Sequence, residues 1–426
     1  MPVSMISIDG TTVTVEVKVE LSRSMLNTEE AILASLNEAG CQLTQAALKY
    51  FDTDGSAIMV GETKLTSKGE VAKVYQTPYG EVEVSRHVYQ TVQGGKTFCP
   101  LERDGRLVIT ATPRLAKMVS SKFAQGSSTQ VARDLAENHG RPLARSYLKT
   151  LSEAVGSVVQ AKEENWCYHV PSLAVPITTV AVGLDGTCML LCEQGYREAM
   201  TGTLSLYDAD GTRQHTIYIG ATPEYGKAQF LARMEREINH LKTHYSDARY
   251  VGLADGAADN WRFLEHHTSV QILDFYHASG YLADVATAVH PRSKAKRSAW
   301  LNTACHQLKH ESGSAEQLLA EMQSLAQKTS LAPATQDKLA SAMTYYDNHH
   351  HQMDYARFQA QHLPIGSGVT EAACKTLVKQ RLCGSGMKWK ETGAATVLSL
   401  RALVLTTARW EQFWAKVNQY GFPVAA

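Results

Sequence analysis

Between Ile177 and Asp274 the sequence alternates apolar, strand-like runs with helical segments in a fixed order. Three strand-like runs come first, over residues 177–191, 197–208 and 215–219. A strongly periodic amphipathic helix from Gly226 to Tyr245 follows, and two short apolar runs then end at Asp255 and Asp274. Strands and helices that alternate in this way predict an α/β fold.

This order of elements is that of an RNase H-like core, in which the first and fourth strands lie side by side. We therefore expect Asp185, within the first strand, to meet Asp255 at the end of the fourth. The alternative for Asp185 is a hairpin turn, because Asp-Gly is a common turn pair. The alternative for Asp255 is a helix cap. A third acid, Glu371, opens a helix after the turn Gly366-Ser367-Gly368, where the helix dipole alone would favour a carboxylate.

These three carboxylates suit metal chemistry. Mg²⁺ prefers oxygen ligands, and two such ions can clamp the attacking and leaving oxygens of a phosphodiester. The order Asp, Asp, Glu on strand, strand and helix therefore indicates a nuclease or a transposase. The segment Asp274-Phe275-Tyr276-His277 follows the next strand. His277 is a candidate to contact a phosphate or a metal-bound water, with Asp274 orienting it; the alternative is that His277 caps the next helix.

The charge balance opposes a generic nucleic-acid binder, because Lys plus Arg equals Asp plus Glu at 42 each. Basic residues nevertheless gather in two places, and a solvated face is the alternative interpretation of each. The first cluster comprises Arg292, Lys294, Lys296 and Arg297. The second follows Glu371 and is predicted to contact DNA phosphates through Lys375, Lys379, Arg381 and Lys388.

Two further modules are predicted before the α/β region. Residues 71–76 and 82–89 alternate apolar with polar side chains around the turn Pro78-Tyr79-Gly80, which predicts a β-hairpin. Helical patterns over 127–138 and 144–155, joined by a turn containing Gly140, predict a helix-turn-helix whose second helix presents Arg145 and Lys149 to DNA. An ordinary helical hairpin is the alternative.

The sequence thus predicts five segments. They are an N-terminal α+β region with the hairpin (1–110), a helix-turn-helix-like domain (111–170), the first part of an RNase H-like core (171–280), an all-helical insertion (281–362) and C-terminal helices that complete the core (363–426).

Five short motifs, distinct from the domain segments above, resemble those of a known family. The chain resembles DDE transposases of bacterial insertion sequences, of the ISKra-type branch. It shares with Mutator-like transposases the order Asp, Asp, Asp-x-x-His and a late Glu after a helical insertion. The resemblance spans roughly residues 70–415. The matching segments are Gly183–Thr187, Ala254–Ala257, Asp274–His277, Pro364–Glu371 and Gly386–Trp389.

The resemblance implies that Asp185, Asp255 and Glu371 hold two Mg²⁺ ions, with Mn²⁺ as a substitute, and that His277 assists. Water and then a freed 3′-hydroxyl would attack phosphodiesters, without a covalent protein–DNA intermediate. The implied partner is double-stranded DNA, at transposon ends and target, bound by a homodimer. Relatives often carry paired cysteines after the hairpin, but here His87 and Cys99 cannot supply the four ligands of a zinc site. No zinc is predicted.

Other classes are weighed against this hypothesis. A hydrolytic RNase H-like nuclease or resolvase shares the core, and a domesticated DNA-binding protein would lack the intact carboxylate trio. Glycoside hydrolysis is disfavoured by the order of the elements. No apolar run predicts a membrane span, the start lacks the features of a signal peptide, and the eight cysteines are scattered. We therefore expect a cytoplasmic protein without a membrane partner.

Overall fold

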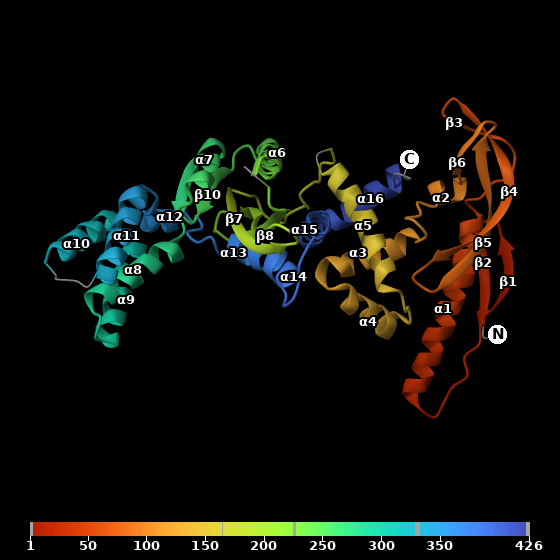
Figure 1. The fold of residues 1–426 in the computed structure, drawn as a ribbon, viewed down its shortest axis with the longest axis horizontal. Helices are drawn as coiled ribbons and strands as arrows, with labels where there is room; N and C mark the ends of the chain where they lie inside the picture. Colours follow the sequence, from red (N-terminus) through yellow and green to blue (C-terminus); the bar gives the residue numbers. More distant parts are fainter. Residues whose placement is uncertain (1–2, 164, 225–226, 329–332, 423–426) are drawn as a thin grey trace. The chain divides into compact units, whose positions relative to one another are not determined.

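The protein is a mixed α/β chain with two-, four- and five-stranded sheets (Figure 1). The computed structural model describes residues 3–163, 165–224, 227–328 and 333–422. It divides into two compact units. The N-terminal unit comprises residues 1–169, 395–404 and 408–426, and the sheet unit comprises residues 170–394 and 405–407. This division does not follow the five predicted segments, because it splits the C-terminal segment 363–426 between the two units. The boundaries of the predicted segments stay predictions.

The N-terminal unit begins with two antiparallel sheets and a long helix. Its β4 and β5 form the predicted hairpin, in which Tyr75 lies opposite Val82. Both side chains are buried with Val84, Leu48 and Leu101 in a small core, because alternate strand residues point to the same face. The elements are β1 (Val3–Asp9), β2 (Thr12–Val17), α1 (Met25–Lys49), β3 (Ile58–Val60), β4 (Thr63–Gln76), β5 (Glu81–Thr91) and β6 (Gly94–Phe98).

Helices from both ends of the chain complete this unit. Ser127 and Gln130 form a capping box at the start of α4, and Gly140 ends that helix in the left-handed conformation that glycine adopts without strain. Arg401 of α15 donates to the Ala124 carbonyl of α3 at 2.6 Å, and Glu411 of α16 pairs with Lys117 of α3. The helices are α2 (Pro100–Asp104), α3 (Pro113–Gln125), α4 (Ser128–His139), α5 (Arg145–Lys162) and α16 (Arg409–Tyr420), together with residues 395–404 of α15 (Glu391–Leu405).

The sheet unit is built on five strands in the order β11-β10-β7-β8-β9. β7 pairs in parallel with β10, and β10 with β11, whereas β8 and β9 are antiparallel to their neighbours. The predicted adjacency of the first and fourth strands is therefore confirmed. The strands are β7 (Thr179–Leu191), β8 (Gly195–Tyr207), β9 (Arg213–Ala221), β10 (Arg249–Ala254) and β11 (Val270–Leu273).

Helices cover both faces of this sheet, as Figure 1 shows, with α6 (Ala228–His244) and α7 (Ala258–His267) on one face. Gly226, the predicted first residue of α6, lies outside the described residues. On the other face are α13 (Gly368–Ala373), the π-helix η3 (Cys374–Lys379) and α14 (Gln380–Leu382). A side chain at Gly202 would collide with Met234 of α6, and one at Gly183 would collide with Thr370 of α13. Glycine at these positions lets the helices approach the strands.

A group of helices separates β11 from α13 along the chain. Its core contains Leu282, Leu308, Met322 and Tyr346, all buried. None of the helices in the described ranges is long and apolar enough to cross a membrane. The helices are α8 (Phe275–Val289), α9 (Lys294–His310), α10 (Ser314–Lys328), α11 (Pro333–His349), η2 (His350–Gln352) and α12 (Tyr355–Ala360).

Candidate metal centre

Asp185 lies in the middle of β7, opposite Thr201 of β8. The interpretation of Asp185-Gly186 as a hairpin turn is therefore wrong. Asp185 points to the same face of the sheet as Gly183, two residues earlier, and Gly183 is the residue on which Thr370 of α13 packs. The strand thus directs its carboxylate towards α13. The Gly186 backbone N–H donates to Asp185 Oδ1 at 2.6 Å.

Asp255 follows the last residue of β10. In the parallel register Leu253 lies beside Gly183, so Asp255 and Asp185 each stand two residues beyond a paired position. Gly256 has φ of +114°, a value that favours glycine, and the turn it forms ends the strand at Asp255. The Ala257 N–H donates to Asp255 Oδ1 at 3.3 Å, which holds the carboxylate near the turn.

Glu371 lies in the first turn of α13. Ser367 Oγ donates to Glu371 Oε1 at 2.9 Å, and the Thr370 hydroxyl lies 2.7 Å from the hydroxyl of Thr203 on β8. These contacts fix the start of α13 against the sheet. As a result Asp185, Asp255 and Glu371 line one small cavity, together with His277. The three carboxylates predicted from the sequence are brought together.

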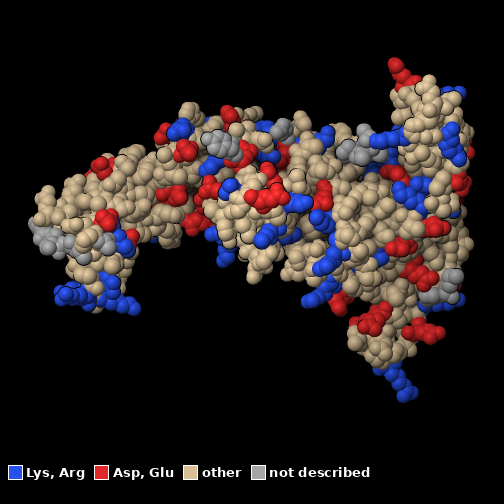
Figure 2. Space-filling view, in the orientation of Figure 1, with Lys and Arg blue, Asp and Glu red and all other residues tan. Residues whose placement is uncertain are grey.

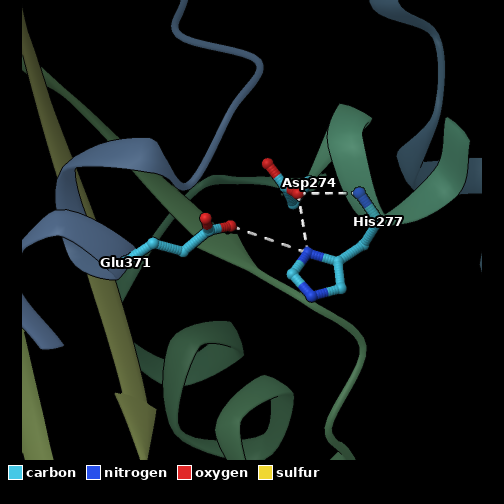
Figure 3. A group of neighbouring side chains, drawn as sticks. All are labelled: Asp274, His277 and Glu371. Atoms are coloured by element: carbon cyan, nitrogen blue, oxygen red, sulfur yellow. Dashed lines mark hydrogen bonds and ion pairs between the residues drawn. The ribbon is translucent and has the colours of Figure 1, made fainter. Parts of the chain in front are cut away.

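Asp274 and His277 form a hydrogen-bonded pair beside this cavity (Figure 3). Asp274 is fully buried and caps α8, because its Oδ2 accepts from the His277 backbone N–H at 2.8 Å and contacts His277 Nδ1 at 2.7 Å. Its Oδ1 accepts from the Ser367 N–H at 2.7 Å. Asp274 is thus the helix cap, and it links the imidazole to the turn that precedes Glu371.

One set of side chains in this site could hold a metal ion. Ligand atoms of Asp274, His277 and Glu371 lie within 4.8 Å of one another. His277 Nδ1 is 3.8 Å from Glu371 Oε1, and in Figure 3 the second ring nitrogen points away from both carboxylates. This set shares Glu371 with the carboxylate trio, so the two are alternative ligand sets in one site.

The charges around Asp185 make its ionised form costly. Burial raises the pKa of Asp185, and the negative charges of Asp255 and Glu198 raise it further, against hydrogen bonds from Gly186 and Cys374. Cys374 Sγ lies 3.4 Å from Asp185 Oδ2. Burial and the Asp185 charge raise the pKa of Cys374 to about 11, so the thiol stays protonated and can donate to the carboxylate. A bound cation would relieve this accumulation of negative charge.

His277 responds in the opposite sense. Burial alone would disfavour the imidazolium, but the hydrogen bond and charge of Asp274 outweigh burial, and the charges of Asp255 and Glu371 add to them. The pKa of His277 is therefore raised, which favours the imidazolium form, with a proton on each ring nitrogen. Such a ring donates hydrogen bonds to an anion.

A groove adjoins the cavity and carries part of the predicted DNA-binding set. It is lined by Asp185 and Glu371 together with the exposed Lys375 and Lys379 of η3. Lys388 is also exposed. Arg381 is a correction: it is only 4 % exposed and its guanidinium lies over the Trp389 ring at 5.1 Å, so it is not presented to a phosphate.

The other predicted DNA contacts lie on α5 of the N-terminal unit. Arg145 and Lys149 are both exposed. Arg145 donates to Thr129 Oγ1 at 3.1 Å, and Lys149 lies 3.7 Å from Glu153, one turn along the helix. An exposed pair of this kind contributes little to stability and leaves the lysine able to exchange partners. The DNA-binding role of α5 stays a prediction.

Three contacts in the site were missed by sequence reasoning. Ser367 had a local signal, since it precedes Glu371 by one helical turn. Cys374 had none, because its partner Asp185 is 189 residues away. Tyr345 likewise had none; its hydroxyl on α11 donates to the Asp255 carbonyl, 90 residues away, at 2.7 Å.

His87 and Cys99, considered for zinc, lie in the N-terminal unit. His87 Nδ1 lies 3.2 Å from Asp52, and Cys99 packs beside the small core around Tyr75. The absence of zinc stays a prediction. Comparison of the sequence with family models and with curated proteins finds no match. The chemistry of the site is therefore inferred from its residues and their geometry.

Proposed function

We propose that this chain is a DNA transposase of the DDE type, with an RNase H-like core in the sheet unit and the helices of residues 281–362 as its insertion. The observation that carries the proposal is that carboxylates from the middle of β7, the end of β10 and the first turn of α13 line one cavity. The order of strands and the pairing of β7 with β10 agree with such a core.

Asp185, Asp255 and Glu371 are the favoured ligands for Mg²⁺ or Mn²⁺. In the competing set Asp274 is fully buried, and both of its oxygens already accept hydrogen bonds, from Ser367 and from His277. A metal ion there would have to displace them. The trio instead offers oxygen ligands, which hard divalent cations prefer. Burial and the charges of Asp255 and Glu198 raise the pKa of Asp185.

The bound ions and the residues of the site would have different roles in cleaving a phosphodiester. The bound ions would supply Lewis-acid activation of the attacking oxygen and stabilisation of the leaving oxygen. His277 is held by Asp274 through Nδ1, and its second ring nitrogen, which points away from Asp274 and Glu371, would donate a hydrogen bond to a phosphate oxygen. Cys374 donates to Asp185 and keeps its carboxylate turned towards the cavity.

The proposed DNA path runs along the groove beside the carboxylates. Lys375 and Lys379 line it and would neutralise phosphates next to the scissile bond. Lys388 would contact the same backbone, and Arg145 and Lys149 would contact the element's ends. Two chains acting together on DNA would process both ends of an element.

The test is strand cleavage and joining of labelled double-stranded DNA that ends in the inverted repeats flanking the coding sequence, with Mg²⁺. The wild-type chain should give joined product. Asp185→Asn and Glu371→Gln should abolish cleavage without loss of folding. Glu198→Gln is the matched control: Glu198 is an acid near Asp185 that pairs with Lys227 at 3.0 Å and is not a proposed ligand, so this variant should stay active.

Each other outcome has a definite meaning. Cleavage without joining would identify a hydrolytic nuclease with the same metal centre. DNA binding without cleavage in any divalent cation would identify a DNA-binding protein that has lost catalysis. Full activity of Asp185→Asn would contradict the metal-carboxylate mechanism.

A further inference from the structure

One segment of the helical group departs from the neutral charge of the chain. Residues 285–310 contain five Lys or Arg residues and no Asp or Glu, whereas the chain as a whole has 42 of each kind. Four of the five lie at one end of α9, where Figure 2 shows blue side chains gathered. They are Arg292, Lys294, Lys296 and Arg297.

These four cations do not stabilise α9. Arg292 precedes the helix, and the other three lie in its first turn. The start of α9 is the positive end of its dipole, where each nearby cation costs on the order of 0.3–1 kcal/mol. Ser293 caps the helix by accepting from the Lys296 N–H at 3.3 Å. Within the described parts of the chain, no carboxylate oxygen lies within 4.0 Å of their charged nitrogens. Arg292, Lys294 and Lys296 are exposed. Their charges are therefore unmatched within the described protein.

We propose that residues 292–297 form a second DNA-binding surface, separate from the groove beside the carboxylates. This surface would bind the phosphate backbone of double-stranded DNA. A row of cations along a helix start suits a polyanion with regularly spaced charges, and contacts to phosphates need no particular base sequence. The proposal rests on the proposed function, because it assumes that DNA is the substrate. It gives the helical insertion a role in holding DNA.

The test compares two variants with the same change in charge. One replaces Arg292, Lys294, Lys296 and Arg297 by Gln. The control replaces four other exposed cations of the sheet unit, Arg197, Arg262, Lys338 and Arg357, by Gln. Fluorescence anisotropy of a labelled 40-base-pair duplex of random sequence gives the dissociation constant between 50 and 200 mM salt.

The slope of log affinity against log salt should fall by about 0.9 for each phosphate contact that is lost. We expect a fall of about 2–4 in the α9 variant and a much smaller change in the control. Equal slopes in the α9 variant and wild type would contradict DNA binding by residues 292–297 while leaving the catalytic proposal intact. If the wild-type chain binds no duplex, the proposed function itself fails.

A separate observation links the helical group to the metal centre. Tyr345 of α11 donates to the Asp255 carbonyl at 2.7 Å and stacks on Tyr281 of α8, with ring centroids 4.0 Å apart and planes 21° apart. A Cβ at Gly256 would lie 3.0 Å from the Tyr345 ring. The turn that ends β10 is therefore held directly against α11.

From this contact we infer that Tyr345 is a positioning residue for Asp255. The hydrogen bond fixes the backbone that carries the carboxylate, and stacking on Tyr281 fixes the ring. This inference also rests on the proposed function, since it assumes that Asp255 binds a metal ion.

The chain offers a matched control on the same helix. Tyr346 also donates to a backbone carbonyl, but its partner is Ala278 of α8, at 3.1 Å, and its side chain is fully buried in the helical core. Tyr345→Phe and Tyr346→Phe therefore each remove one hydroxyl and one such hydrogen bond. Only the first should act on the metal centre.

Apparent Mn²⁺ affinity is measured by titrating the full-length protein and detecting free Mn²⁺. Tyr345→Phe should weaken binding about tenfold, as is typical when a residue supporting a ligand is lost. Tyr346→Phe should lower the melting temperature and leave Mn²⁺ affinity within twofold. Wild-type affinity in Tyr345→Phe would overturn the inference. Wild-type Mn²⁺ affinity in Asp255→Asn would instead contradict the proposed metal centre.

Discussion

Glu102 in the N-terminal unit and Asp185 in the sheet unit are both carboxylates with restricted access to solvent, and the protein treats them in opposite ways. Glu102 Oε1 accepts from Lys73 at 2.7 Å and from Tyr75 at 2.6 Å, and Arg86 lies 3.4 Å away. Burial alone would raise the pKa of Glu102, but these bonds and charges outweigh it and lower the pKa. Asp185 has a raised pKa and acidic neighbours.

The difference separates a carboxylate whose charge is balanced by nearby cations from one whose charged neighbours are acids. An unpaired buried charge is costly, so proteins usually supply a partner. At Glu102 the fold supplies two cations and a phenol. At Asp185 it supplies the Gly186 N–H, the Cys374 thiol and further acids. Sites that carry such unmatched charge are often functional. The comparison therefore supports a metal centre at Asp185 and a structural role at Glu102.

The largest expected effect is on catalysis. Asp185→Asn should lower Mg²⁺-dependent DNA cleavage on the order of 10³-fold or more, in the range seen when a member of a catalytic set is removed. Without metal the same variant should be slightly more stable, by about 1 kcal/mol, because a repelled charge is removed. Cleavage rates and thermal melts measure the two effects. If Asp185→Asn were less stable than wild type and still cleaved DNA, Asp185 would have the structural role assigned to Glu102, and the contrast between the two carboxylates would be wrong.

The second effect is on stability. Glu102→Gln should lower the free energy of unfolding of the N-terminal unit by about 2–3 kcal/mol, because Lys73 and Arg86 lose their shared partner. Cleavage should stay within about twofold of wild type. Urea unfolding with a probe in the N-terminal unit measures the change. If stability is unaffected while cleavage falls, Glu102 belongs to the functional machinery and the comparison fails.

The third effect concerns metal binding. Mg²⁺ at tenfold over its dissociation constant should stabilise the sheet unit by about 1.4 kcal/mol. The rise in melting temperature should persist in Glu102→Gln and disappear in Asp185→Asn. Melting curves with Mg²⁺ and with EDTA provide the measurement. A rise that survives in Asp185→Asn would place the ion elsewhere.

The smallest effect is the pH dependence of stability. Because the pKa of Glu102 is lowered by folding, its contribution is fully present above its ordinary value of 4.5 and is lost as pH falls through the folded pKa. In the metal-free protein, the contribution of Asp185 to stability changes with pH in the opposite direction. Because its pKa is raised by folding, this contribution is fully present below the ordinary value of 3.8 and is lost as pH rises through the folded pKa. Acid melts of Glu102→Gln should therefore be flatter than wild type.

The sequence predicted the order of the sheet better than the details of the site. The apolar runs before Asp255 and Asp274 end where β10 and β11 end, because polar residues follow buried strands at the sheet edge. The Asp-Gly pair at Asp185 was ambiguous, since the same pair suits a turn or a strand whose glycine gives room to a neighbour. Only the pairing of β7 with β8 decides between them.

Other features depend on packing between distant segments. The π-helix from Cys374 to Lys379 interrupts a run that reads as regular helix, and it carries both Cys374 and the two groove lysines. Arg381 looked like its basic neighbours, but packing on Trp389 buries it. Contacts across 189 and 90 residues, at Cys374 and Tyr345, leave no periodic trace in the sequence.

The central claim is that Asp185, Asp255 and Glu371 together bind the catalytic metal. The most direct test is Mn²⁺ binding, measured by the electron paramagnetic resonance of free Mn²⁺, in wild type, Asp185→Asn and His277→Ala. We predict binding in wild type, loss in Asp185→Asn and retention in His277→Ala. Retention in Asp185→Asn with loss in His277→Ala would contradict the claim and would place the ion among Asp274, His277 and Glu371.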